Sequence, residues 1–189
     1  MMPKLKKSIT LMEVLIVILI LGFILTSLLS LVARNFFNVD QVTMRSQATY
    51  FAKEGIEMVL NIVDTNKEKG MVRNCVDYDS NYECKDTFLT GTYKVGLEIS
   101  SSQYDINPTS QNFEDNLLYY HTGSESKFYF NHDDTGEETF FARYLEFDEM
   151  NLKDGQQSDD IFKVESVVEY NKGGNKNEVS LETFISNTR

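Results

Sequence analysis

Histidine, cysteine and positive charge are all scarce in this chain of 189 residues. Its two histidines, His121 and His132, lie in turn-like stretches, where we expect solvated side chains. The sequence contains no nucleophile elbow, no Walker loop and no zinc-ligand spacing. These absences leave no basis for a catalytic centre, so we expect neither an enzyme nor a bound cofactor.

Basic side chains number 18 against 29 acidic ones. Three of the 18, Lys4, Lys6 and Lys7, precede residue 9, so residues 9–189 have 15 basic side chains against 29 acidic ones and a net charge of −14. A surface this acidic repels polyanions, which argues against nucleic-acid binding.

Two acidic stretches have part of the pattern of a calcium loop. Residues 77–83 place oxygen-bearing side chains at alternate positions, as calcium loops do. An EF-hand loop, however, needs glycine where Tyr82 stands and a bidentate glutamate where Phe88 stands. Residues 131–136 are equally incomplete. We therefore expect two solvated acidic turns and no metal site.

Apolar residues, in contrast, are abundant near the start of the chain. The run from Val14 to Ala33 has 20 residues, and a helix of that length is about 30 Å long, enough to cross a hydrocarbon core. Only four small or polar residues interrupt the run: Gly22, Thr26, Ser27 and Ser30. A secretory signal peptide, the alternative interpretation, has a shorter apolar stretch and a better cleavage site than the sequence before Arg34 offers.

The charges around this run predict its orientation and a function. Lysines at positions 4, 6 and 7 precede it, and basic residues beside an apolar span stay cytoplasmic, so the C-terminal part should face outward. One acid, Glu13, stands at its start. A charged side chain costs about 2.5–3.5 kcal/mol at the bilayer centre and usually marks a function with a definite partner.

The residues from Lys7 to Glu13 read Lys-Ser-Ile-Thr-Leu-Met-Glu, which resembles the N-terminal signature of type IV pilins and type II secretion pseudopilins. The resemblance implies that a prepilin peptidase cleaves between Ser8 and Ile9 and methylates the new amino terminus of Ile9. It also implies that Glu13 neutralises the terminal amine of a neighbouring pilin or pseudopilin subunit. Further implied partners are membrane lipid, an inner-membrane assembly platform and a motor ATPase.

Two departures from the family pattern refine this expectation. The family usually has glycine where this chain has Ser8, which predicts slower processing. Many major pilins have proline in the membrane helix where Ser30 stands, and no proline occurs between Pro3 and Pro108. The second departure favours a minor pilin or minor pseudopilin.

A second helical pattern follows the apolar run. Apolar and small residues recur at spacings of three and four, with polar residues between them: Ala48, Phe51, Ala52, Gly55, Ile56, Val59, Ile62 and Val63. We expect one continuous helix that ends near Asp64, at a polar stop. The alternative is a separate amphipathic helix beside an unrelated domain.

Beyond this helix the pattern changes to the period of two that is typical of β-strands. The expected strands are Thr92–Ile99, Leu117–Tyr120, Lys127–Asn131, Thr139–Phe147, Phe162–Tyr170 and Val179–Ile185. Turn signals at residues 121–124 and 171–175 predict two hairpins, and residues 64–90, 100–116 and 148–160 are predicted loops. The fold class is therefore α+β, with a long N-terminal helix packed on a C-terminal antiparallel sheet.

The predicted domain organisation has four parts. These are a leader peptide (1–8), a transmembrane and assembly helix (9–33), its amphipathic continuation (34–64) and an extracytoplasmic sheet domain (65–189). Cys75 and Cys84 fall in the outward domain, where a disulfide closing so short a loop contributes about 2–3 kcal/mol; two free thiols are the alternative.

The sequence thus predicts a filament subunit that resides in the inner membrane and then in a pilus or pseudopilus. An uncleaved, single-pass anchor for an outward binding or sensory domain is the main alternative. A third interpretation, a secreted enzyme released after Ala33, is disfavoured by the missing catalytic residues.

Overall fold

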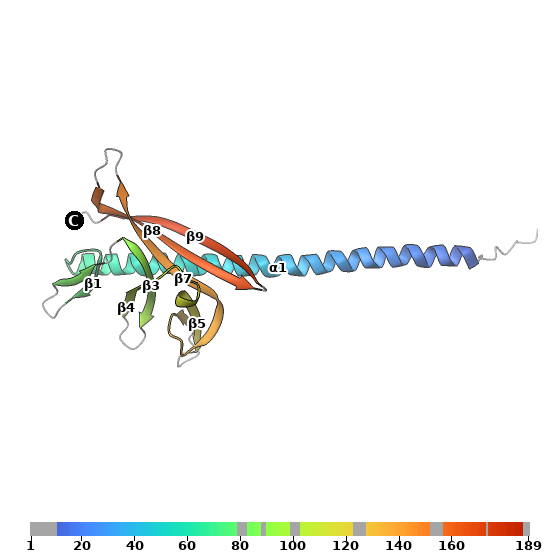
Figure 1. The fold of residues 1–189 in the computed structure, drawn as a ribbon, viewed down its shortest axis with the longest axis horizontal. Coiled ribbons are helices and arrows are strands. Elements are labelled where there is room, and N and C mark those ends of the chain that lie inside the picture. The colour runs from blue at the N-terminus through green and yellow to red at the C-terminus, as the bar shows by residue number, and fades with distance from the viewer. Residues whose placement is uncertain are drawn as a thin grey trace, which may run out of the picture. The chain divides into compact units, whose positions relative to one another are not determined.

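The computed structural model describes residues 11–78, 83–87, 90–98, 103–122, 128–151, 157–172 and 174–186. The chain forms two compact units, Met1–Thr43 and Met44–Arg189. One helix, α1 (Leu11–Glu68), contributes to both units, and all of the β-structure among the described residues belongs to the second (Figure 1). The predicted α+β class is confirmed.

In the first unit, α1 is the apolar helix that the sequence predicts. Every side chain from Leu11 to Thr43 is exposed. Two of the few polar side chains are satisfied within the helix, because the hydroxyl of Thr26 donates to the carbonyl of Gly22 and that of Ser27 to the carbonyl of Phe23. The predicted helix start at Ile9 lies outside the described residues.

In the second unit, α1 is amphipathic. The buried positions recur at intervals of three and four, as predicted: Met44, Ala48, Ala52, Gly55, Met58, Val59, Ile62, Val63 and Asn66. The predicted end of the helix near Asp64 is wrong, since α1 continues to Glu68. The helix ends where Gly70, with a φ of 71°, allows the amide of Met71 to donate to the carbonyl of Asn66 at 2.8 Å.

Within the described residues, seven strands form one antiparallel sheet and two more form a small hairpin. The path through the sheet is β4-β3-β7-β5-β6, with β8 and β9 added on the other side of β7. The strands of the sheet are β3 (Gly91–Glu98), β4 (Gln103–Pro108), β5 (Leu117–Thr122), β6 (Phe128–Asn131), β7 (Glu137–Asn151), β8 (Gln157–Lys172) and β9 (Asn175–Ser186). The hairpin consists of β1 (Cys75–Tyr78) and β2 (Cys84–Thr87), and a short 3₁₀ helix, η1 (Glu114–Asn116), precedes β5.

Both predicted hairpins are confirmed by the register. Thr122 of β5 pairs with Phe128 of β6, and Lys172 of β8 pairs with Asn175 of β9. The loop predictions are partly wrong, because β1, β2, β4 and the polar ends of β7 and β8 all lie in ranges predicted to be loops. In β1, β2 and the ends of β7 and β8, backbone pairing holds the chain in the β conformation without the apolar alternation on which the prediction depended. In β4 a short alternation is present, and its Tyr104 and Ile106 pack against the core.

Two apolar clusters join α1 to one face of the sheet. The first contains Met44, Ala48, Ala52, Leu118, Phe141, Val168 and Tyr170. The second contains Met58, Val59, Val63, Val95, Leu145, Phe147, Val164 and Ile185. This arrangement confirms that the amphipathic part of α1 covers the sheet.

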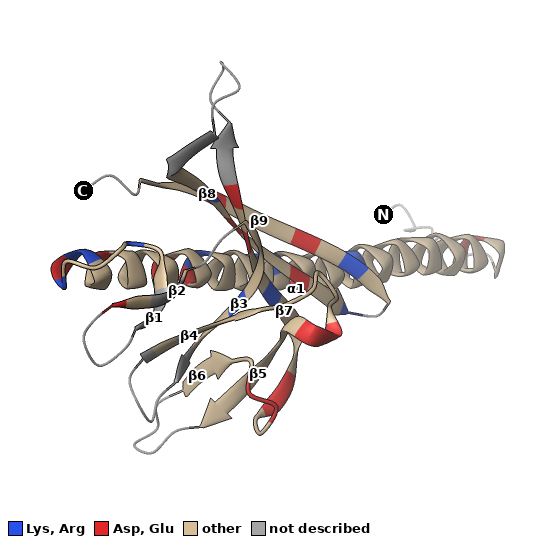
Figure 2. Ribbon diagram, turned by 60° about the vertical axis from the view of Figure 1, so that its left-hand side comes forward, with Lys and Arg blue, Asp and Glu red and all other residues tan. Residues whose placement is uncertain are grey.

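The opposite face of β7, β8 and β9 carries glutamates in register. Glu146 pairs with Glu165, and Glu165 pairs with Glu182 across the three strands. Tyr144 is buried on the same face, and burial together with the nearby glutamates raises its pKa to about 12. Acidic residues are visible along β9 in Figure 2.

Candidate functional site

The apolar part of α1 is the first candidate site, and Glu13 is its single acid. The helix is long and apolar enough to span a membrane. Glu13 lies in the first turn of the described helix, and no other charged residue occurs between Leu11 and Ala33. The neighbouring side chains Met12 and Val14 are exposed, so Glu13 is set in an uncovered apolar surface. Such a surface can be covered by lipid or by other apolar helices.

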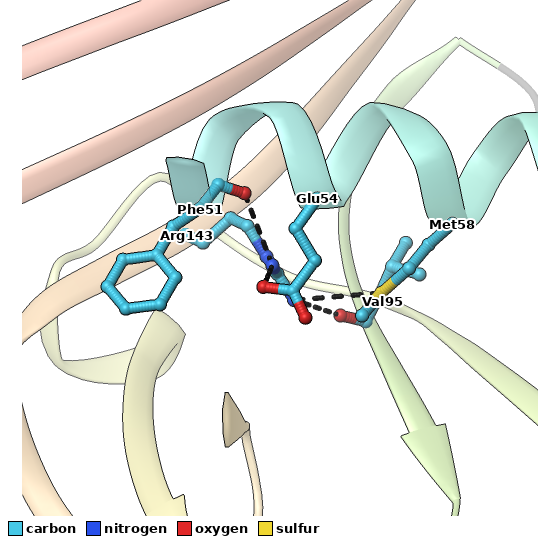
Figure 3. A network of polar contacts seen from close by, with 5 residues as sticks. All are labelled: Phe51, Glu54, Met58, Val95 and Arg143. Atoms are coloured by element: carbon cyan, nitrogen blue, oxygen red, sulfur yellow. Dashed lines mark hydrogen bonds and ion pairs between the residues drawn. The ribbon is translucent and has the colours of Figure 1, made fainter. Parts of the chain in front are cut away.

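The second candidate site is a buried arginine between α1 and the sheet, which the sequence analysis missed. Arg143 of β7 has only 1% of its surface exposed. Its guanidinium donates to the carboxylate of Glu54 at 3.0 Å and to the carbonyl of Phe51 at 3.2 Å, both on α1. It also donates to the carbonyl of Val95 on β3 at 3.1 Å (Figure 3). One side chain thus connects the helix to two strands.

The sheet topology explains why Arg143 occupies this position. On one edge, β7 pairs with β3 at residues 145–147 and with β5 at residues 137–142. Arg143 lies between these two stretches, where the strand that pairs with β7 changes from β3 to β5. The paired residues of β3 end at Tyr93, so Val95 lies beyond the ladder between β3 and β7. The guanidinium therefore supplies the carbonyl of Val95 with a donor that no strand provides there.

Burial and ion pairing act on Arg143 in opposite directions. Burial lowers the pKa of the Arg143 guanidinium, while the carboxylate of Glu54 opposes that shift. Arginine nevertheless stays charged in proteins, so the buried cation needs its partner. The side chain of Glu54 is 39% exposed, which leaves the pair in contact with water on one side.

Gly55 and Ser166 extend the polar region around Arg143. A Cβ atom at Gly55 would lie 2.6 Å from the hydroxyl of Ser166 and 3.2 Å from Cδ of Arg143. Ser166 is fully buried on the apolar face of β8, between Val164 and Val168. Along α1, β7 and β8, respectively, Gly55, Arg143 and Ser166 separate the two apolar clusters. They form a polar layer across the interface of helix and sheet.

A second polar connection lies near the end of α1. The buried side-chain amide of Asn66 donates to the carbonyls of Arg73 at 3.0 Å and Cys75 at 2.7 Å. Cys75 and Cys84 form a disulfide that links β1 to β2. The cysteine pair was predicted from the sequence, whereas Asn66 falls just beyond the predicted end of the helix, in the stretch interpreted as its polar stop.

The two histidines differ from their prediction as solvated turn residues. His121 is buried, stacks on Tyr129 with ring centroids 4.9 Å apart, and lies 3.0 Å from the carbonyl of Asp133. Nδ1 of His132 lies 3.0 Å from the carbonyl of Leu117. Burial, followed by the charge of Arg143, lowers the pKa of His132 to about 3. The prediction of solvation was wrong because His121 lies within β5, paired with Tyr129 of β6, and because the bend that carries His132 packs against Leu117 of β5.

The acidic stretches do not form a recognisable metal centre in the described part of the chain. Among those residues, no group of three or more histidine, cysteine, aspartate or glutamate side chains is placed to hold an ion. Residues 79–82 of the first stretch lie outside the description. In the second stretch, the carboxylate of Asp133 accepts from the amide of Thr135, which is the geometry of a local turn.

The remaining predicted site residues precede the described part of α1. They are the leader lysines Lys4, Lys6 and Lys7 and the junction residues Ser8 and Ile9. Cleavage and methylation at that junction therefore remain predictions. No known family model, no curated protein and no solved structure matches the chain.

Proposed function

We propose that this chain is a structural subunit of a type IV pilus-like or type II secretion filament, as a minor pilin or minor pseudopilin. The observation that carries the proposal is a membrane-length apolar segment of α1, residues 11–33, in which every side chain is exposed and Glu13 is the only charged residue. The basic leader and the junction residues Ser8 and Ile9 supply the rest of the signature.

In the proposed mechanism the chain is first held in the inner membrane with its C-terminal domain outside. A prepilin peptidase removes the leader and exposes the amine of Ile9. That amine lies about 6 Å along the helix from Glu13, so a neighbouring subunit shifted along the axis can bring its own amine to this carboxylate. The two charges, each costly in an apolar environment, then offset each other.

Repetition of this contact builds a filament. A head-to-tail contact that does not close generates a helical array. The assembly platform and motor ATPase would move subunits out of the bilayer, with the apolar helices inside the filament and the acidic domains outside. Acidic domains on the outside agree with the net charge of residues 9–189.

Mass spectrometry of the N-terminus of the membrane-extracted chain tests the processing step. We expect a chain that begins with methylated Ile9. A chain that retains Met1 or Met2 in the assembled material would contradict the proposal and favour the uncleaved anchor for an outward binding or sensory domain.

Substitution of Glu13 tests the assembly step. Glu13→Leu should still insert in the membrane, since it removes a charge from an apolar helix, but should be absent from sheared filaments. Glu13→Asp keeps the charge and serves as the matched control, with incorporation reduced but detectable. Undiminished incorporation of Glu13→Leu would remove the role assigned to this acid.

A further inference from the structure

The apolar segment joins the sheet-containing unit through α1 itself, at the bond between Thr43 and Met44. A force on the apolar segment therefore reaches the sheet through residues 44–68. The contacts of these residues with the sheet decide whether the helix holds its position or slides.

Most of these contacts are apolar, and apolar contacts have little directional preference. The buried stripe repeats with the helical period, so along most of it a shift of α1 by one turn, about 5.4 Å, would replace one small or aliphatic residue with another. Ala48 and Ala52, for example, are one turn apart and are both fully buried. Gly55 is the exception, because a side chain at its place would meet Ser166 and Arg143. Apolar burial alone therefore fixes the axial position of α1 weakly.

The contacts of Arg143 have the directionality that the apolar clusters lack. Its acceptors Phe51 and Glu54 move with the helix, whereas Val95 belongs to the sheet (Figure 3). Axial displacement of α1 would break the bonds to the helix and leave a buried cation without its carboxylate. Leaving such a charge unpaired is strongly unfavourable.

The two points at which force would be applied are Met44 on α1 and the C-terminal end of β9. They lie at opposite ends of the interface between α1 and the sheet. Met44 belongs to the first apolar cluster, against which Val179 of β9 packs. Ile185, near the end of β9, belongs to the second cluster together with Val63. A pull on Met44 and on the C-terminal end of β9 therefore shears the helix along the sheet, so that the contacts share the load instead of breaking in succession.

We propose that Arg143 acts as a mechanical clamp that fixes the axial position of α1 on the sheet when the apolar segment is pulled. The inference rests on the proposed function only because that function anchors the apolar segment in a membrane or filament. Asn66, bonded to the carbonyls of Arg73 and Cys75, ties the far end of α1 to the segment that leads into β1 and is not part of the clamp.

Force spectroscopy on the full chain in detergent micelles tests the clamp. One handle is attached through an azide-bearing residue at position 35 and the other at the C-terminus, which loads the interface in shear. Arg143→Met keeps a long side chain but removes every donor. We expect its unfolding rate at constant force to rise roughly tenfold, the effect of losing a hydrogen bond to a charged group.

A second pulling geometry separates clamping from ordinary stability. With handles at position 112 and at the C-terminus, the force does not enter through α1, and Arg143→Met should accelerate unfolding much less. Equal acceleration in both geometries would overturn the proposal. So would an unchanged rate in the shear geometry.

Two further variants keep the test valid if Arg143→Met does not fold. Glu54→Gln retains the shape and an acceptor at a partly exposed position, and should raise the rate in shear several-fold. Glu57→Gln is its matched control, because it breaks only an exposed ion pair with Lys53 and should leave the rate unchanged. Equal rates for these two variants would overturn the proposal. None of these measurements depends on cleavage or filament entry, so the clamp and the proposed function can fail separately.

Discussion

Substitution of Gly55 by alanine tests whether the polar layer between α1 and the sheet is as closely packed as the structure indicates. Gly55 lies in the interior of α1, where alanine normally stabilises a helix by about 0.5–1 kcal/mol. Here the new methyl group would lie 2.6 Å from the hydroxyl of Ser166 and 3.2 Å from Cδ of Arg143. One of these side chains must move, and the Arg143 side chain is held by its hydrogen bonds.

Overpacking of this kind costs about 1–3 kcal/mol, which exceeds the gain in helix propensity. We therefore expect Gly55→Ala to lower the free energy of unfolding by about 1 kcal/mol, or the melting temperature by about 2–4 °C for a domain of this size. The cost should disappear once the hydroxyl is removed, because the 2.6 Å contact is then gone. The Ser166 hydroxyl is buried and has no hydrogen-bond partner among the described residues, so Ser166→Ala alone should be nearly neutral or stabilising.

The assay is urea unfolding of the full chain in detergent micelles, followed by near-ultraviolet circular dichroism of the tyrosines because the chain has no tryptophan. Wild type, both single variants and the double variant complete a double-mutant cycle. Gly55→Ala should be destabilising in the wild type and neutral or stabilising in the Ser166→Ala background. The same cost in both backgrounds, or a stabilised Gly55→Ala single variant, would refute the packing argument.

Two other predictions concern buried polar groups of the same unit. Asn66→Ala should lower the free energy of unfolding by about 1–3 kcal/mol, because it removes the side-chain amide that donates to the carbonyls of Arg73 and Cys75. Thr65→Ala, at an exposed position, is the control. A urea midpoint of Asn66→Ala equal to that of this control would contradict the prediction. The pKa of His132 is about 3 in the folded chain against an ordinary value of 6.5, so the unfolded chain binds the proton first as the pH falls. Relative to His132→Gln, the wild type should therefore lose about 1.4 kcal/mol in its free energy of unfolding per pH unit below pH 6.5. If the free energies of unfolding of the two proteins instead run parallel between pH 6 and pH 4, His132 is not buried in its neutral form.

The helix and the main strands were predictable because each has a strong hydrophobic period. The stripe from Ala48 to Val63 shows the helical period, and Val164 lies between the charged residues Lys163 and Glu165 in a strand with a period of two. That pattern predicts that each helix or strand buries one of its faces. The β8–β9 hairpin was equally predictable, because the turn-forming residues 171–175 mark its centre.

Strands β1 and β2 could not be predicted from alternation, because each has four residues and no clear period of two. Strand β4 does alternate, and its Tyr104 and Ile106 pack against the second apolar cluster, but two apolar positions before Pro108 are a short signal. Arg143 was missed for a different reason. A charged residue within a strand normally indicates the solvated face, and only the change of partner along β7 explains an arginine on the buried one. That change depends on pairing between residues far apart in the sequence, which local patterns do not encode.

The glutamates aligned across β7, β8 and β9 have a consequence for crowded copies of the chain. Two copies that approached through this face would bring Glu146, Glu165 and Glu182 of one against the same row of the other. Lys163 on the same face pairs with Glu165 at 2.9 Å and with Glu182 at 3.2 Å and offsets part of this charge, and the repulsion that remains extends over about 8 Å at physiological ionic strength. Neighbouring domains would therefore keep a salt-dependent distance from each other on that side, and would draw closer as salt is added.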